Sequence, residues 1–411
     1  MSAESKTQVR PSGAASTVAP HARRRARGIV AALSVTEVVS WGVVYYAFAA
    51  FLVPMQHELG YSTAQLTGAF SLALLISGAT GIAVGRYLDA HSPRALMTAG
   101  SIAATLLVVA WSHVDGLAAF YLVWTGLGLA MAAILYEPAF VVLAKWFPDA
   151  DERRRAMTAL TLVAALASFI FLPLSQALIE AHGWRDALVI LAVILAAVTI
   201  PLHALALRPA PVPPNTARHP RTPDAEAKLV LRSQSFWLFT AAFFLATTTG
   251  IAMTILAIPY LLQRGYSPGF AAFAVGLVGL SQIPGRVVFA ALGGRLPRAL
   301  ALPAVFLLIA LGIAALTAAD DQALVIGALV LLGMGNGMTT LARATVIADR
   351  YGATAYGSIA GVAASATTAA RAVGPVTAAA YAAATGYTTL LWTLAAATLL
   401  AGFLAYRSER C

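Results

Sequence analysis

Five ionisable side chains interrupt long apolar stretches of the sequence: Glu37, Glu137, Arg286, Arg343 and Arg371. An arginine at the centre of a membrane helix costs roughly 2.5–3.5 kcal/mol, so such a charge normally faces a partner or a water-filled path. A guanidinium can hold a carboxylate through two parallel hydrogen bonds. The pattern therefore predicts an anionic ligand drawn to the three arginines, with the two acids as proton carriers or ion-pair partners.

Arg286 is the strongest candidate for the anion site. It lies in the apolar run SQIPGRVVFAAL (residues 281–292) and precedes Arg295 by about 13 Å of helix, which is too far for full snorkelling to the interface. We interpret it as the anchor of a substrate carboxylate. The alternative is an interhelical ion pair with Glu37 or Glu137 that only sets the packing.

The other two arginines allow structural roles as well. Arg371 precedes Gly374 and Pro375, which loosen the backbone of a helix that could move as a gate, so binding and structural roles are both open. Arg343 lies close to Arg350, a spacing that favours snorkelling or gating over binding.

Further candidates surround these charges. Glu37 and Glu137 could each carry a proton when buried or be held ionised by an arginine. Tyr45, in SWGVVYYAF, and Asn336, in GMGNGM, are candidates for contact with the substrate. Aromatic residues in such places often only pack, and runs of small residues let helices approach closely.

The composition indicates the elements that must position these side chains. Of 411 residues, 60% are hydrophobic and only 11% are charged, with a mean hydropathy of +0.79, which is typical of a membrane protein. About 20 apolar residues span a bilayer. Twelve such windows lie near residues 28–53, 64–84, 95–112, 117–143, 155–180, 185–207, 236–262, 269–292, 299–318, 322–345, 356–383 and 386–406.

Polar segments divide these windows into two sets of six. Residues 208–235 are charged and rich in proline, which predicts a cytoplasmic linker between bundles at 28–207 and 236–406. Residues 1–27 predict a disordered cytoplasmic tail, and residues 407–411 a short cytoplasmic end.

The positive charges are distributed unevenly along this arrangement. All but five of the 27 Lys and Arg residues fall in segments predicted to be cytoplasmic. We therefore expect a multi-pass protein of the cell (inner) membrane, with both termini in the cytoplasm. The net charge of +10 then reflects topology, and no nucleic acid partner is expected.

Several kinds of chemistry are not supported by the residues. Cys411 is the single cysteine, which excludes disulfides and thiolate metal sites in the body of the chain. The seven histidines lack metal-binding spacing, and phosphate loops and nucleophile elbows are missing. We therefore expect no metal, no cofactor and no enzyme activity.

The two halves of the chain resemble each other. VPMQHELGYS at 53–62 matches IPYLLQRGYS at 258–267, and PRAL occurs at 93–96 and again at 297–300, at nearly the same separation. A parallel duplication of a six-helix unit is typical of transporters, whose substrate sites form near mid-membrane between the repeats.

The segment GRYLDAHSPR, with Gly85, Asp89, Pro93 and Arg94, resembles the loop between helices 2 and 3 of the major facilitator superfamily. GGRLPR at 293–298 is similar to the remnant of this loop in the second half of the family's chains. GWRDALVIL, which begins at Gly183, is similar to the family's junction between helices 5 and 6. The resemblance implies an all-α membrane protein, with twelve transmembrane helices in two pseudo-symmetric bundles. It also implies that Gly85, Asp89 and Arg94 form a gating motif that latches the outward-facing state.

Within the superfamily the chain is more similar to the monocarboxylate-transporter-like branch, with its oxalate/formate relatives, than to drug/proton antiporters. FYLVWTGLGLA lacks the antiporter arginine of helix 4, and ASFIFLPLSQAL lacks the glycine motif of helix 5. In that branch an arginine of helix 8 contacts the substrate carboxylate, a role that falls on Arg286. Animal members place an aspartate one turn earlier, where this chain has Gln282, so coupling through that residue is in doubt.

The resemblance implies a monomeric transporter, secondary active or facilitative, for a small organic anion such as a monocarboxylate. It would work by alternating access in the lipid bilayer, with protons as a candidate coupling ion. Substrate-binding candidates are then Arg286, Arg371, Gln282, Tyr45 and Asn336. Export of a metabolite or antibiotic, and a sensor that transports nothing, are the alternatives.

Overall fold

The chain folds into helices throughout the part that the computed structural model describes, residues 20–147, 149–207, 230–292, 297–351 and 356–410. The first half contains α1 (Pro20–Trp41), the π-helical turn η1 (Gly42–Tyr46), α2 (Ala47–Leu59), α3 (Thr63–Ala90), α4 (Pro93–Ser112), α5 (Leu117–Ile134), α6 (Tyr136–Trp146), α7 (Ala150–Ala164) and α8 (Leu166–Ala206). The second half contains α10 (Gln234–Gln263), α11 (Pro268–Leu292), α12 (Arg298–Ala318), α13 (Gln322–Tyr351), α14 (Tyr356–Thr385) and α15 (Tyr387–Arg410).

These helices give the twelve membrane spans that the hydropathy predicts. Ten segments of the described chain are long and apolar enough to cross a bilayer. The longest of them, Glu152–Ala206, is two spans, because Gly183 bends the backbone with φ 77° and ψ 166°. The 30-residue α14 is long enough to be the twelfth span. Interruptions within a span occur at η1, between α5 and α6, and at Ala165 between α7 and α8, and all three lie beside the site described below.

The repeated sequence GYS marks the same turn in both halves. Gly60 and Gly265 adopt left-handed backbone conformations, with φ of 71° and 84°, that end α2 and α10. Ser62 and Ser267 then begin α3 and α11, where each side chain accepts a hydrogen bond from a backbone N–H three residues later, at 3.2 and 3.3 Å. The duplication predicted from sequence is therefore a repeat of structure.

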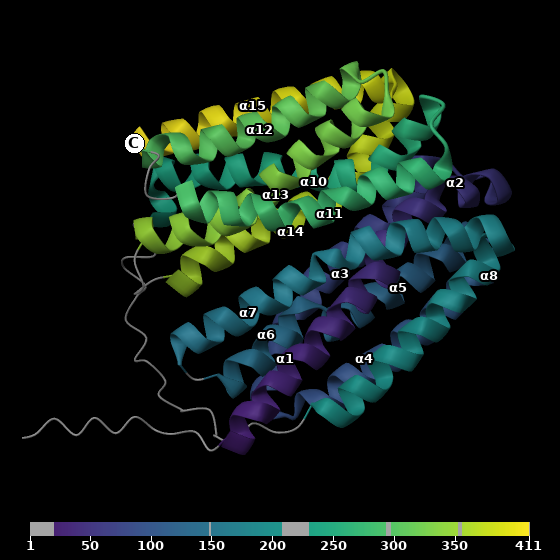
Figure 1. The fold of residues 1–411 in the computed structure, drawn as a ribbon, viewed down its shortest axis with the longest axis vertical. Helices are drawn as coiled ribbons and strands as arrows, with labels where there is room; N and C mark the ends of the chain where they lie inside the picture. The colour runs from purple at the N-terminus through teal and green to yellow at the C-terminus, as the bar shows by residue number, and fades with distance from the viewer. Residues whose placement is uncertain (1–19, 148, 208–229, 293–296, 352–355, 411) are drawn as a thin grey trace, which may run out of the picture.

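Figure 1 shows two bundles, α1–α8 and α10–α15. The start of α1, the end of α8, the start of α10 and the end of α15 lie at one end of the molecule, on the left of the view, which we call the terminal end. The opposite end, near α2, is called the far end. The bundles lie closer together at the far end than at the terminal end (Figure 1).

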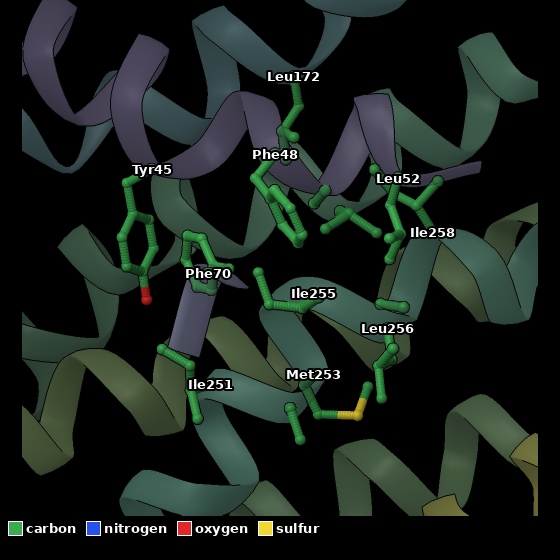
Figure 2. Close-up of a cluster of buried hydrophobic side chains, with 14 of the residues drawn as sticks. Tyr45, Phe48, Leu52, Phe70, Leu172, Ile251, Met253, Ile255, Leu256 and Ile258 are labelled. Carbon is green, nitrogen blue, oxygen red and sulfur yellow. The ribbon is translucent and has the colours of Figure 1, made fainter. Parts of the chain in front are cut away.

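The bundles contact each other through α3 with α14, α8 with α11, and α2 with α10. The Ser168 hydroxyl of α8 donates a hydrogen bond of 3.3 Å to the carbonyl of Gly276 in α11. Apolar side chains of α2, including Phe48 and Leu52, face Ile255 and Ile258 of α10 in one buried cluster (Figure 2). This apolar seam joins the bundles between mid-membrane and the far end.

Candidate functional site

A cavity of about 250 Å³ lies between the two bundles. The first bundle contributes Trp41, Tyr45, Tyr46, Tyr136, Ala164 and Ala165 to its lining. The second contributes Ala246, Thr247, Gly250, Ile251, Thr254, Gln282, Arg286, Asn336, Thr339, Thr340 and Arg371. All five residues that the sequence nominates for substrate binding are in this lining: Arg286, Arg371, Gln282, Tyr45 and Asn336.

The cavity carries an excess of positive charge. Arg286 and Arg371 contribute two cations, and none of its described lining residues is an acid. Both charges act on the hydroxyl groups of Tyr46 and Tyr136, so the two arginines and the two tyrosines share one electrostatic environment. An anion would meet two guanidinium groups from one side and phenolic donors from the other.

Arg286 projects into the cavity from α11 with most of its hydrogen-bonding capacity free. It is half-buried, and its Nη2 donates a hydrogen bond of 3.2 Å to Oε1 of Gln282, one turn earlier. Its buried Nε has no partner in the described part of the chain. Gln282 thus orients the guanidinium and leaves its charge uncompensated. A carboxylate in the same position would neutralise that charge.

Close packing of α11 against α13 fixes the position of these side chains. A Cβ at Gly337 would lie 2.7 Å from the Cα of Gln282, and a Cβ at Gly285 would lie 2.8 Å from the Cα of Met334. Only glycine permits this approach between backbones. It explains Gly333 and Gly337 of the GMGNGM run, which bring Asn336 of α13 to the same wall as Gln282.

Four aromatic rings form the opposite wall. The ring of Trp41 lies 4.9 Å from those of Tyr45 and Tyr136, and Tyr45 lies 5.0 Å from Tyr46. The π-helical turn η1 follows Trp41 directly, at a place where a Cβ on Gly42 would overlap the ring of Phe171. Single π-helical turns are common at functional sites because they reorient side chains.

Tyr136 is a site residue that the sequence reasoning missed. It begins α6 directly after a break at Leu135, whose φ of −92° and ψ of −159° end α5. The sequence signal was Pro138, which favours the first turn of a helix and therefore indicated a helix start within the predicted span.

The two acids of the first bundle are in different environments. Glu37 is fully buried outside the cavity lining, and its Oε2 accepts a hydrogen bond of 2.9 Å from Nε1 of Trp41. Its Oε1 has no partner among the described residues. Glu137 is exposed in the first turn of α6.

Neither acid forms an ion pair with Arg286. Ion pairs in the described part of the chain include those of Arg185 with Glu58 and Asp115 and of Arg264 with Asp320, and none of the described ion pairs joins Arg286 to Glu37 or Glu137. The purely structural interpretation of Arg286, in which it pairs with Glu37 or Glu137, is therefore not what the structure shows.

The gating candidates lie at the terminal end. Gly85 and Asp89 belong to α3, and Arg94 is exposed in the first turn of α4. Arg343 belongs to α13. The side chains of Asp89 and Arg343, and the surroundings of Gly85, lie outside the described residues. Over the same described parts of the chain, no three His, Cys, Asp or Glu residues group as metal ligands would.

Comparison with known proteins identifies the architecture. The family model for the Major Facilitator Superfamily matches residues 33–375 and 250–410. The chain belongs to this superfamily. It is accordingly a membrane transporter and not an enzyme, and its two six-helix bundles are the two halves of the superfamily fold.

Curated relatives are similar at low identity. The oxalate:formate antiporter of Oxalobacter formigenes is 24% identical over 240 residues, covering 58% of this chain and 56% of the relative. Monocarboxylate transporter 13 of Bos taurus is 29% identical over 223 residues, covering 53% and 50%. Monocarboxylate transporter 3 of Rattus norvegicus is 29% identical over 255 residues, covering 57% and 48%. The chain spans about half the length of the curated relatives it matches.

Solved structures support the fold. A bacterial homologue of the lysosomal transporter Spinster, in an inward-facing and unoccupied conformation, superposes with a TM-score of 0.77 at 14% identity, covering 94% of this chain and 97% of that one. The nucleoside transporter NupG superposes with a TM-score of 0.73 at 14% identity, covering 94% and 99%.

Proposed function

We propose that this transporter moves a small organic anion, a monocarboxylate, across the membrane by alternating access. The observation that carries the proposal is the cavity between the bundles, which presents Arg286 and Arg371 with no acid in its described lining. A half-buried guanidinium without a protein counter-ion is a site for a ligand carboxylate. Gln282 and Asn336 would hydrogen-bond the bound substrate, and Tyr45 would pack beside it.

The names of the relatives favour the same substrate class. The oxalate:formate antiporter and the monocarboxylate transporters are named for small carboxylates. Their match covers part of each protein, so their names support the proposal without deciding it. The cavity adds an independent argument, because its two arginines favour an anion whatever the relatives carry.

Orientation follows from the distribution of Lys and Arg. With both termini in the cytoplasm, the terminal end faces inward and the bundle contacts lie toward the outside. The structure then corresponds to an inward-facing state. The exposure of Arg94 in this state fits a latch that closes only when the transporter faces outward.

Proton coupling, if the transporter uses it, is best supported at Glu37. This carboxyl is fully buried, and a proton on its unpartnered Oε1 would remove the cost of burying a charge. Trp41 bonds its other oxygen and also lines the cavity, so substrate and proton would meet the two sides of one side chain. Glu137, being exposed, has no comparable position.

Uptake of labelled short-chain carboxylates into proteoliposomes tests the proposal, with and without an inward proton gradient. We expect saturable uptake by the parent protein. Arg286→Gln should weaken binding by about 30-fold, since removing one partner of a desolvated charge pair costs about 2 kcal/mol or more. Arg371→Gln should also weaken it.

Arg407→Gln is the matched control, because it removes one exposed positive charge at the end of α15, outside the cavity. It should transport like the parent protein. If no carboxylate moves although the protein is monodisperse and thermally stable, the anion assignment is wrong and export of another compound becomes the leading hypothesis. Equal uptake by Arg286→Gln and the parent would refute the role of Arg286.

A further inference from the structure

A second, smaller cavity adjoins the charged one. It holds about 40 Å³, and its lining shares four residues with the larger cavity: Tyr46, Thr254, Gln282 and Asn336. We call these shared residues the neck, because each of them borders both spaces. A ligand in the charged cavity would extend past these side chains to reach the smaller space.

Beyond the neck the lining is mostly apolar, and Ser168 is its one polar side chain among the described residues. Seven hydrophobic side chains line the space: Leu172, Met253, Ala257, Val275, Val278, Leu329 and Leu332. All but Val278 are at most 4% exposed, and they come from both bundles. Leu172 and Met253 lie near the apolar seam between α2 and α10 in Figure 2. An apolar group that enters this space would leave water almost completely.

Along one face of helix α11, the side chains that line the two cavities change from charged to apolar. Arg286, Gln282, Val278 and Val275 lie at successive turns, so Arg286 and Val278 are separated by about 12 Å of helix axis. Long side chains on a helix point back toward its N-terminus. The guanidinium of Arg286 accordingly reaches Gln282, next to the neck, and the apolar residues begin one turn further on.

Helix α13, which packs against α11, repeats the same order on the same wall. Leu329 and Leu332 line the apolar space, Asn336 lies at the neck, and Thr339 lines the charged cavity. On both helices the lining side chains thus change from polar to apolar in one direction, toward the far end. This agreement is what a ligand with a charged head and an apolar tail requires.

We propose that the smaller cavity is the subsite for the apolar tail of the substrate. The substrate is then a monocarboxylate whose carboxylate lies at Arg286 and whose aliphatic tail lies among Val278, Leu329 and Leu332. This inference rests on the proposed function and narrows it. A dicarboxylate of equal length is excluded, because its second carboxylate would enter a space without a charged partner.

The volume sets the length of the tail. The subsite holds about 40 Å³, against about 250 Å³ for the charged cavity, so it admits only a short aliphatic tail. Tails that are longer must displace Leu332 or another wall residue.

Calorimetric titration of the purified full-length protein with straight-chain monocarboxylates, from acetate to octanoate, tests the subsite. The corresponding dicarboxylates are titrated in parallel. We expect affinity to rise about 4-fold for each methylene, which is the burial free energy of about 0.8 kcal/mol, until the subsite is full and then to fall. Dicarboxylates should bind at least about 10-fold more weakly than monocarboxylates of equal length.

Leu332→Ala enlarges the subsite and should move the optimum to a chain longer by about one or two carbons, while acetate binds as before. Leu307→Ala is the matched control, since Leu307 is 48% exposed on α12, outside both cavities. An affinity independent of chain length, or an unchanged optimum in a folded Leu332→Ala variant, would overturn the subsite and leave the proposed function standing. If no carboxylate binds to the folded protein, both fall.

Discussion

Adding one methyl group at Gly337 tests whether contact between α11 and α13 positions the anion site. The new Cβ of Gly337→Ala would lie 2.7 Å from Cα and 2.8 Å from the carbonyl carbon of Gln282. Carbon atoms are in favourable contact at about 3.5–4.0 Å, so the helices must separate by about 1 Å. Backbone atoms cannot rotate out of the way as a side chain can.

The separation has consequences for stability and for the site. Overpacking of this kind costs about 1–3 kcal/mol. Gln282, which holds Arg286 by a hydrogen bond, lies directly at the contact, and Asn336 is the neighbour of Gly337. A displacement of about 1 Å is large for a site built to place several donors at once, so we expect uptake to fall by about 10-fold or more.

Gly327→Ala is the control for this experiment. Gly327 lies on the same helix, and a Cβ there would meet no other atom within 4 Å. Alanine should be tolerated at this position and should favour the helix by about 1 kcal/mol. We would measure thermal melting of both purified variants and their carboxylate uptake in proteoliposomes.

The result that refutes the reasoning is a Gly337→Ala protein that melts and transports like the Gly327→Ala protein. The helices would then not depend on this contact, and another interaction would have to hold Gln282 and Arg286 in place. Loss of uptake with unchanged melting would instead separate the site from stability and strengthen the positional argument.

Two further variants probe other parts of the molecule. Glu37→Gln keeps the size of the side chain and the hydrogen bond from Trp41, but the amide cannot exchange a proton. Uptake driven by a proton gradient should be lost, while exchange of labelled for unlabelled substrate persists. Gradient-driven uptake at the parent rate would exclude Glu37 as the proton carrier. Arg185→Gln removes ion pairs of 2.7 and 2.6 Å to Glu58 and Asp115 at the far end, where both acids are well exposed. Each exposed pair contributes at most about 1 kcal/mol, so a small drop in melting temperature is expected, and changed substrate affinity would contradict this structural role.

The membrane spans and the duplication could be predicted because their signals are local. Apolar length fixes a span, and the repeated GYS encodes a helix end followed by a helix start in both halves. The site residues were also predicted by a local rule, because an ionisable side chain inside a membrane span is costly and normally faces a partner or a ligand path. That rule selected Arg286 and Arg371, which line one cavity.

The rotation of helices could not be predicted from the sequence. Glu37 and Glu137 follow the same rule, but one is buried behind Trp41 and the other is exposed. The difference depends on contacts between helices and on the break at Leu135, which redirects α6. Likewise, the glycines of GMGNGM predict a close approach without saying that α11 is the partner.

The charge of the cavity has a consequence for the transport cycle under the proposed function. Closing the terminal end without a substrate would remove water from Arg286 and Arg371 and leave both unpaired, at several kcal/mol for each ion. A bound carboxylate replaces the lost water at Arg286 with two charge-assisted hydrogen bonds, and its tail gains burial beyond the neck. Closure is therefore less costly with substrate than without it. The arginines that select an anion thus also hold the empty transporter open at the terminal end, which is the coupling between binding and closure that alternating access needs.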